Sequence, residues 1–180
     1  MCTITGITSA QACGEGDGGI KAVYIAEFEN LGFTVASKKV SALTGALKKF
    51  VFHKDATAFF NQTGERPSLR IHRYNQETFM KFADTDAAAD AADDLKACCK
   101  LVAIVLLENG NVRLQGVQFT SSAKTALEVS AEECLATVAN MSDVSGAESR
   151  TEIRLISKSK NVVAGLNSVL TEAYLDALVA

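Results

Sequence analysis

The stretch LVAIVLLENGNVRLQ, residues 101–115, decides the fold that this sequence predicts. Its first seven residues, 101–107, are all apolar, which is typical of a strand buried on both faces. Asn109-Gly110 follows and is a strong signal for a type I′ turn. Apolar and polar residues then alternate over 112–115, as in a strand that returns beside the first. The stretch therefore predicts an antiparallel β-hairpin whose first strand lies at the centre of the protein.

Other segments carry the apolar patterns of strands. Residues 20–28 are apolar on most of both sides, so they predict a second buried strand. At Gly116 the apolar pattern changes phase, which predicts a bulge. The segment 127–138 fits either a helix or a strand, and both alternatives remain open. The remaining predicted strands lie at 50–52, 57–60, 69–72 and 152–157.

Three segments carry loop or turn patterns. Residues 1–19 are small and polar and end in the run Gly14-Glu15-Gly16-Asp17-Gly18-Gly19, which predicts an extended N-terminal arm and a flexible turn. Residues 30–48 show no strong periodicity and are predicted to form a long loop. Residues 61–67 contain Thr63-Gly64-Glu65 and are predicted to be a turn.

Two helices are predicted from spacing and capping residues. The first runs from about Asp86 to Cys99 after a possible cap at Thr85, with its apolar residues on one stripe and its acids mostly on the other face. The second is short, covers residues 168–179 and begins at Asn167 or Ser168. The apolar stripe of the first helix consists of Ala88, Ala91, Ala92, Leu95, Cys98 and Cys99.

The order of these elements predicts the fold class. Strands pair locally and no strand-helix-strand unit repeats, which favours antiparallel sheets over a doubly wound parallel sheet. We expect an α+β fold that is mainly β: an antiparallel β-sandwich or barrel flanked by one helix, with a short C-terminal helix. At 180 residues the chain is sized for a single domain, residues 1–180.

Composition excludes several function classes. The net charge of −3 disfavours tight nucleic-acid binding over the whole surface, because clustered cations carry most of the affinity for phosphates. The longest apolar run, 101–107, is too short to cross a bilayer, and the N-terminus lacks the pattern of a signal peptide. Without a secretory signal, the five cysteines are expected to be thiols rather than a disulfide framework.

Glycines and acids suggest two ligand sites, and the context of each argues against it. Residues 14–19 fit G-x-G-x-x-G, but a dinucleotide site needs a strand before the glycines and a helix after them. An EF-hand loop over the acidic helix would need an oxygen ligand at Ala88 and a glycine at Ala89. A solvated acidic face is therefore expected, formed by Asp84, Asp86, Asp90, Asp93 and Asp94.

The cysteines and histidines are also weak candidates for an active site. Cys98-Cys99 is a vicinal pair without zinc-finger spacing, and both thiols are expected to pack as small apolar residues. A thiol nucleophile would need His53 or His72 as its base, and neither lies in a recognisable catalytic motif. We therefore expect no enzymatic activity, no catalytic residue, no cofactor and no metal. The five lysines between residues 30 and 54 fit a solvated face or a contact with a protein of opposite charge.

Several segments in order carry a family resemblance that covers most of the chain. They are the arm that ends in GGIKAVYIA (18–26), the strand KFVF (49–52), the helix leading into 101–107, the run ENGNVRLQGV (108–117) and the late strand at 152–157. Together these segments resemble the tail tube proteins of tailed bacteriophages. The resemblance rests on pattern and order rather than on one diagnostic motif.

The resemblance implies a structural virion protein that forms stacked rings, most commonly hexameric, around the channel for genome delivery. It implies self-association, contacts with other tail or connector proteins, passage of DNA without specific binding, and a location in the viral tail after synthesis in the bacterial cytoplasm. In such proteins the sheets of neighbouring subunits join to line the channel. Residues 1–19 and 30–48 are the segments that the resemblance assigns to contacts between rings.

Three alternatives stay open beside the tail tube. A head-to-tail connector or a tail terminator would share the fold but stop at a single ring. The tube subunit of a bacterial contractile injection system would make the same demands on the sequence. A cytosolic thiol-dependent enzyme would instead require a reactive thiol among Cys98, Cys99 and Cys134.

Overall fold

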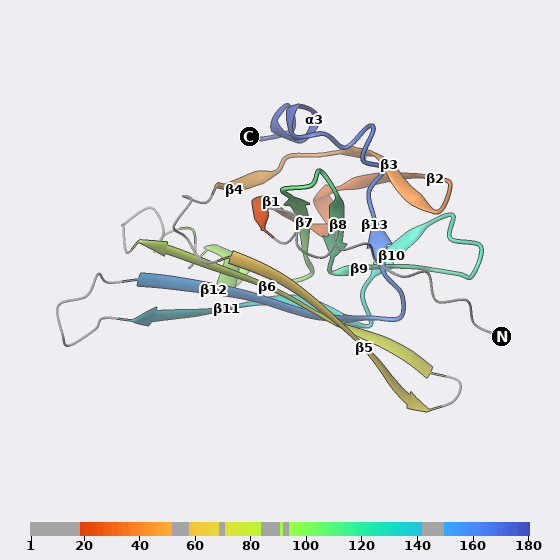
Figure 1. Ribbon diagram of the computed structural model, residues 1–180, viewed down its shortest axis with the longest axis horizontal. Helices are drawn as coiled ribbons and strands as arrows, with labels where there is room; N and C mark the ends of the chain where they lie inside the picture. The colour runs from red at the N-terminus through yellow and green to blue at the C-terminus, as the bar shows by residue number, and fades with distance from the viewer. Residues whose placement is uncertain (1–18, 52–57, 69–70, 84–90, 92–93, 142–149) are drawn as a thin grey trace, which may run out of the picture.

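The computed structural model describes residues 19–51, 58–68, 71–83, 91, 94–141 and 150–180 (Figure 1). Within these residues the protein is mainly β, with antiparallel sheets and short helices. The predicted fold class is confirmed. Of the two architectures that the sequence allowed, the structure is a sandwich, because its two largest sheets pack face to face around a shared apolar core.

A five-stranded antiparallel sheet forms the centre of the protein, with the strand order β13-β8-β7-β1-β4. Its two middle strands are the apolar segments that the sequence predicts to be buried, and both are confirmed. Every residue from Leu101 to Leu106 in β7 is buried. The strands of this sheet are β1 (Ile20–Glu27), β4 (Lys48–Val51), β7 (Leu101–Leu107), β8 (Val112–Gln115) and β13 (Val163–Ala164).

The loop between β7 and β8 differs from the predicted type I′ turn. Only Gly110 has a positive φ, of 77°, and its N–H donates to the Leu107 carbonyl over 2.9 Å. The loop is therefore a type I turn closed by a left-handed glycine, the usual three-residue hairpin connection. Asn109 contributes through its side chain instead, because its Oδ1 accepts a hydrogen bond from the N–H of Asn111.

Gly116 ends β8 rather than forming the predicted bulge. Its φ is +87°, and a Cβ at this position would lie 2.1 Å from the Leu101 carbonyl oxygen. Glycine thus lets the chain leave the five-stranded sheet and enter β9 (Val117–Phe119). β9 pairs with β10 (Leu127–Val129), and β11 (Glu132–Met141) follows. The undecided segment 127–138 is therefore mostly strand.

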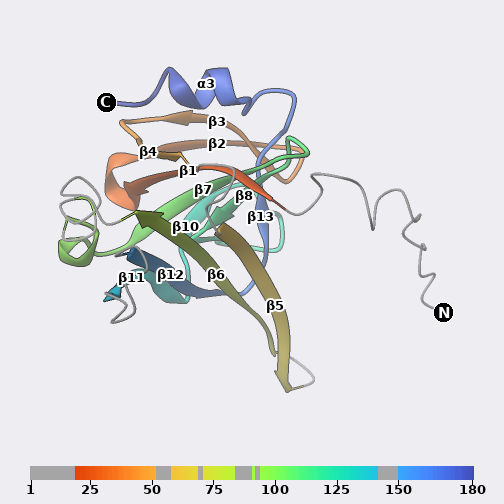
Figure 2. The same ribbon diagram turned by 60° about the vertical axis from the view of Figure 1, so that its left-hand side comes forward.

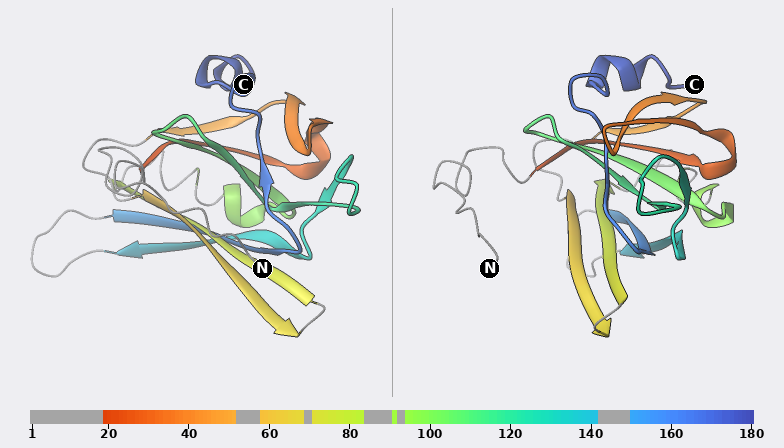
Figure 3. Two further views of the ribbon diagram at one scale, coloured as in Figure 1. Left: turned by 45° about the vertical axis from the view of Figure 1, so that its right-hand side comes forward. Right: turned by 90° about the vertical axis from the view of Figure 1, so that its right-hand side faces the viewer.

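A second, four-stranded antiparallel sheet has the order β11-β12-β6-β5. β12 (Arg150–Ser159) contains the predicted late strand, and β6 (Ile71–Ala83) extends the one predicted at 69–72. β5 and β6 form a long hairpin that projects beyond the rest of the protein (Figure 3). Leu69 and Arg70 lie outside the described residues.

The predicted turn at 61–67 is wrong, because β5 (Ala58–Ser68) runs straight through it. Pairing with β6 continues from Ala58 to Glu65, and the register then shifts before Ser68. Pro67 lies at this shift and on an edge strand, where the missing N–H of a proline is tolerated. Cross-strand pairing therefore overrides the turn preference of Thr63-Gly64-Glu65.

The predicted long loop at 30–48 is also wrong. After the 3₁₀ turn η1 (Phe28–Asn30), the chain forms a hairpin of β2 (Gly32–Ala36) and β3 (Lys39–Thr44) and then enters β4. Ser37 and Lys38 join the two strands, with φ of 50° and 61°. Positive φ at both loop positions is the pattern of a type I′ turn, which Ser-Lys does not signal in a sequence.

Both helices are shorter than predicted where the structure describes them. Residue 91 and residues 94–97 are helical, and Lys100, with a φ of 53°, turns the chain into β7. The predicted cap at Thr85 lies outside the described residues. α3 (Glu172–Asp176) is the C-terminal helix, and its cap is Thr171 rather than Asn167 or Ser168, because the Thr171 side chain accepts a hydrogen bond from the Tyr174 N–H.

The five-stranded sheet is covered on both faces (Figure 2). Val23, Leu101 and Val105 face the four-stranded sheet, where they meet Met80 and Ile153. On the opposite face lies the larger apolar cluster, which is covered by the β2–β3 hairpin and the C-terminal segment. This cluster includes Tyr24, Val40, Leu43, Leu47, Ile104, Leu114, Leu170 and Leu175.

Gln115 joins the two sheets through polar contacts inside the protein. Its side-chain NH₂ donates to the carbonyl oxygens of Gln76 at 3.0 Å and Leu155 at 2.9 Å, and its Oε1 accepts a hydrogen bond from the Thr78 hydroxyl. All of these groups are buried. A buried amide with all these partners fixes the position of β8 over β6 and β12, because any shift would leave buried polar groups unpaired.

Candidate assembly surface

The outer face of the four-stranded sheet is open to solvent. From Thr151 to Leu155, buried residues of β12 alternate with the half-buried Glu152 and the exposed Arg154, and the buried ones face the five-stranded sheet. The exposed residues of β12 therefore lie on the outer face, in register with Phe79 and Glu77 of β6. No described element covers this face, so it is available to a partner (Figures 1 and 2).

Apolar side chains occupy the middle of this outer face. Phe59 of β5 stacks on Phe79 of β6 with ring centroids 5.1 Å apart, and the Arg154 guanidinium lies 5.4 Å from the centre of the Phe79 ring. Phe59, Leu135 and Ile156 are 39%, 52% and 44% exposed. These three side chains come from three strands of the sheet, β5, β11 and β12.

Three cross-strand ion pairs lie on the outer face. Arg154 lies 3.1 Å from Glu77, Lys158 lies 3.0 Å from Glu132, and Lys81 lies 3.9 Å from Glu152. The members of each pair come from neighbouring strands, so the three pairs cross the sheet. These three pairs add no net charge to the face.

The same sheet ends in two strands that have one neighbour each. β5 and β11 are the edge strands, and in the described part of the chain no further strand pairs with either of them. An edge strand directs every second N–H and C=O outward, where they can pair with a strand of another molecule. The two edges lie on opposite sides of the sheet, so one copy can pair with two neighbours.

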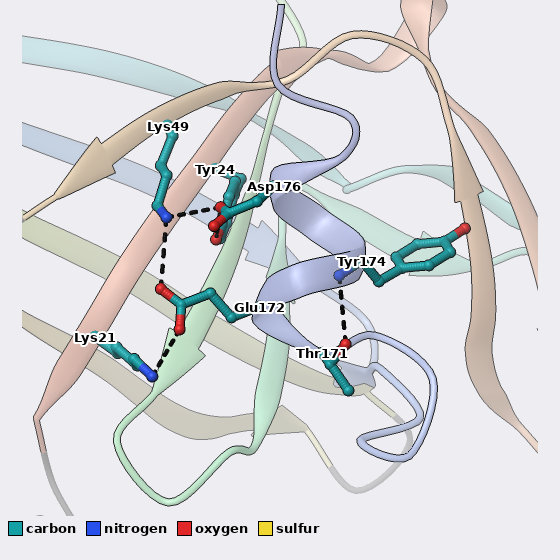
Figure 4. Close-up of polar contacts among 7 residues, drawn as sticks. All are labelled: Lys21, Tyr24, Lys49, Thr171, Glu172, Tyr174 and Asp176. Atoms are coloured by element: carbon teal, nitrogen blue, oxygen red, sulfur yellow. Dashed lines mark hydrogen bonds and ion pairs between the residues drawn. The ribbon is translucent and has the colours of Figure 1, made fainter.

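A second group of polar residues fixes the C-terminal helix to the protein (Figure 4). The Glu172 carboxylate forms ion pairs with the ammonium groups of Lys21, at 2.6 Å, and Lys49, at 3.4 Å. Lys49 also lies 2.7 Å from Asp176, which accepts a hydrogen bond of 2.7 Å from the buried Tyr24 hydroxyl. We call these five residues the C-terminal ion-pair cluster.

The neighbouring Tyr174 ties the same helix to β3. Its hydroxyl donates to the Leu43 carbonyl at 2.7 Å and accepts from the Leu43 N–H at 3.0 Å. Both backbone groups of Leu43 are thereby satisfied at the edge of the β2–β3 hairpin. The helix acts as a structural cover of the apolar cluster below it, since Leu175 is fully buried.

The C-terminal ion-pair cluster makes stability depend on pH. Hydrogen bonds from Lys49 and then from Tyr24 lower the pKa of Asp176. A carboxyl whose pKa is lower in the folded state stabilises the fold above its unfolded pKa of about 4, and this stabilisation disappears as the pH falls through the folded value. We expect Asp176→Asn to lower the free energy of unfolding at pH 7 by about 1 kcal/mol, because the cluster is partly exposed.

Chemical denaturation at several pH values between 7 and 3 tests this expectation. The wild type should lose stability more steeply than Asp176→Asn as the solution is acidified. Glu133→Gln, at an exposed carboxylate of β11, is the matched control and should follow the wild type. Parallel curves for wild type and Asp176→Asn would show that the cluster does not contribute.

The structure separates the three described cysteines. Cys134 is buried, and burial raises the pKa of its thiol to about 12. Burial also raises the pKa of the half-buried Cys98, with a smaller contribution from Glu27. Cys98 packs against the core between the sheets, whereas Cys99 is exposed, so the prediction that both thiols pack inside is wrong for Cys99. The high pKa values make Cys98 and Cys134 poor nucleophiles at neutral pH.

Most of the other residues considered from the sequence lie outside the described residues, and the described ones belong to separate elements. His72 lies in β6, whereas His53 and residues 14–18 lie outside the described residues, as do the acids of the first helix apart from Asp94. Lys48 and Lys49 belong to β4, and Lys38 and Lys39 lie at the tip of the β2–β3 hairpin. Among the described residues no three His, Cys, Asp or Glu side chains are grouped so that they could hold a metal.

Comparison with protein-family models, with curated proteins and with solved structures gave no match. In the described part of the chain, no helix is long and apolar enough to cross a membrane.

Proposed function

We propose that this protein is a structural subunit of a phage tail tube and that it assembles into stacked rings. The observation that carries the proposal is the four-stranded sheet, which has one face open to solvent and two edge strands without a second neighbour among the described residues. The family resemblance of the sequence favours the same function. In this proposal the edge β11 of one copy pairs with the edge β5 of the next.

Such a contact has the geometry that ring formation needs. β5 and β11 are different surfaces on opposite sides of one sheet, so their pairing is head-to-tail rather than symmetric. Head-to-tail contacts close into a ring when the rotation between copies permits, and a closed ring leaves no unpaired edge. The sheets of all copies would then form one continuous wall.

The outer face of the sheet would line the channel of the ring. Three of its cations already pair with carboxylates: Arg154 with Glu77, Lys158 with Glu132 and Lys81 with Glu152. Binding to DNA phosphates depends on cations that neutralise them, so a face with paired charges holds DNA weakly. This is the property that a conduit for genome delivery requires, and it needs neither a cofactor nor a catalytic residue.

Negative-stain electron microscopy of the purified protein over a concentration series tests the proposal. We expect rings at low concentration and stacked rings or tubes at high concentration. Rings that never stack would favour a head-to-tail connector or a tail terminator over a tail tube. A protein that remains monomeric at the highest concentration would contradict assembly through the sheet edges.

A further inference from the structure

A groove lies beside β4, the edge strand of the five-stranded sheet opposite β13. Its volume is about 760 Å³, which is within the usual range of binding pockets. Residues of the segment 94–98 and the C-terminal Val179 and Ala180 contribute to its lining. The lining is mostly apolar and includes Ile25 and Phe50. The groove can therefore cover several apolar side chains of a bound molecule.

One side of the groove is a strand edge. Leu47, next to β4, donates its N–H to the Leu178 carbonyl at 2.9 Å and accepts from the Ala180 N–H at 3.2 Å, so its backbone groups point away from β1. Alternation along the strand directs the N–H and C=O of Lys49 and Val51 to the same side. Within the ranges that the structure describes, β4 itself pairs with no strand on this side. The edge therefore offers backbone donors and acceptors to a further strand.

Two carboxylates, from Glu27 and Asp94, give the groove negative charge. The Glu27 carboxylate accepts a hydrogen bond of 3.2 Å from the Asn30 side-chain amide, and Asp94 is exposed. Among the residues that the structure describes, neither carboxylate has a cation as its partner. A cation on a bound molecule would supply the opposite charge.

The two lysines that line the groove do not supply this charge. The Lys49 ammonium lies 2.7 Å from Asp176 and 3.4 Å from Glu172, both in the C-terminal ion-pair cluster. The Lys48 ammonium donates to the Ala180 carbonyl at 3.0 Å. Both lysines are thus held by the C-terminal segment, at a different part of the groove from its carboxylates.

We propose that this groove binds an extended segment of another protein, which carries lysine or arginine beside apolar side chains and adds to β4 as a further strand. Backbone hydrogen bonds to Lys49 and Val51 would hold the segment, and the apolar lining would cover its alternate side chains. Glu27 and Asp94 would bind its cations. This contact is separate from the edges of the four-stranded sheet and does not depend on ring formation.

Charge argues against the chain's own segments as the occupant. Residues 1–18, 84–90 and 142–149 contain acids but no lysine or arginine, and in residues 52–57 one lysine is offset by one aspartate. These are the longer segments outside the described residues, and the described segments have fixed places in the fold. A segment that brings net positive charge to the two carboxylates therefore comes from a different protein.

Fluorescence anisotropy with two synthetic peptides and the full-length protein tests this inference. The probe is KTVTVTK with fluorescein at its N-terminus, and in an extended strand its lysines and valines lie on one side. The peptide ETVTVTE has the same pattern with the opposite charge. We expect KTVTVTK to bind with a dissociation constant of about 100 μM or lower, and ETVTVTE to bind at least about tenfold more weakly.

Two further comparisons assign the binding to the groove and to the strand edge. Combining Glu27→Gln with Asp94→Asn should weaken the binding of KTVTVTK about tenfold. Combining Glu108→Gln with Glu133→Gln, which alters two exposed carboxylates outside the groove, should leave it unchanged. KTVTVTK that is N-methylated at its three central residues cannot pair as a strand and should bind at least about tenfold more weakly. Circular dichroism checks that each variant is folded.

Several results would overturn the inference. If KTVTVTK does not bind the full-length protein, another segment covers the groove or the groove takes a different ligand. Equal binding of KTVTVTK and ETVTVTE, or binding that the changes at Glu27 and Asp94 do not weaken, would exclude recognition of a cation. Unchanged binding of the N-methylated peptide would exclude strand addition. Electron microscopy of rings tests the proposed function independently, because none of these measurements requires assembly.

Discussion

Replacing Ile104 by aspartate should abolish folding. Ile104 lies in the middle of β7, has no exposed surface and packs in the larger apolar cluster, where it pairs in register with Tyr24 of β1 and Leu114 of β8. A carboxylate at this position would be buried without a partner, at a cost of several kcal/mol. Because domains are stable by only about 5–15 kcal/mol, and the isoleucine packing is lost as well, most of the protein should be unfolded.

The solubility of the expressed variant and its far-ultraviolet circular dichroism measure this effect. Ile156→Asp is the matched control, because it is the same substitution at a strand position that is 44% exposed. The control should remain soluble and retain the β-sheet spectrum. Soluble and folded Ile104→Asp protein would show that β7 is not the centre of the core.

The strands that the sequence predicts best are those in which the local pattern of apolar residues matches the burial of the strand. β7 and β1 are apolar on both sides because the five-stranded sheet is covered on both faces, and such runs have few alternative structures. The exposed and buried residues of β12 likewise alternate with the period of two that identified this strand. Local pattern and final environment agree in these segments.

The segments predicted wrongly depend on pairing that a local pattern does not contain. β5 crosses residues with turn preference because β6 provides a partner along its length. The β2–β3 hairpin turns at Ser37 and Lys38, two residue types that rarely adopt positive φ, and the apolar side chains of β2 are only partly buried. In both hairpins tertiary contacts decide the structure against the intrinsic preference of the residues.

The candidate assembly surface could be predicted only in part. The alternation at 152–155 indicates a strand with one exposed face, but the ring stack of Phe59 on Phe79 joins residues from two strands whose register the sequence does not reveal. The C-terminal ion-pair cluster brings Lys21 and Tyr24 to Glu172 and Asp176 across most of the chain. No spacing rule relates residues so far apart, so this cluster had no signal in the sequence.

A proline in β11 should prevent assembly without unfolding the protein, at one of two adjacent positions. Ala136 and Thr137 are consecutive in this edge strand, so one directs its N–H to β12 and the other directs it outward. Proline at the first position removes a hydrogen bond of the sheet and should cost about 3 kcal/mol. Proline at the second position removes only an outward donor, and its ring blocks the approach of a neighbouring strand.

We therefore expect one of Ala136→Pro and Thr137→Pro to keep the melting temperature of the wild type. In that variant the concentration needed for rings should rise about tenfold or more, because several backbone hydrogen bonds form together along a paired edge. Sedimentation velocity and electron microscopy measure the assembly, and thermal melting identifies the variant that is folded. Thr137→Ala keeps the N–H and should assemble normally.

Comparison of the two proline variants distinguishes assembly through the sheet edge from assembly through any other surface. If the folded proline variant still forms rings at the wild-type concentration, β11 does not pair between copies and the wall of the ring must be built differently. If Thr137→Pro is the folded variant and stays monomeric while Thr137→Ala forms rings, the blocked backbone group itself is the cause, since the exposed Thr137 side chain is lost in both variants. A contact that depends on the backbone of an edge strand is a contact between sheets, which is the interaction that a continuous tube wall requires.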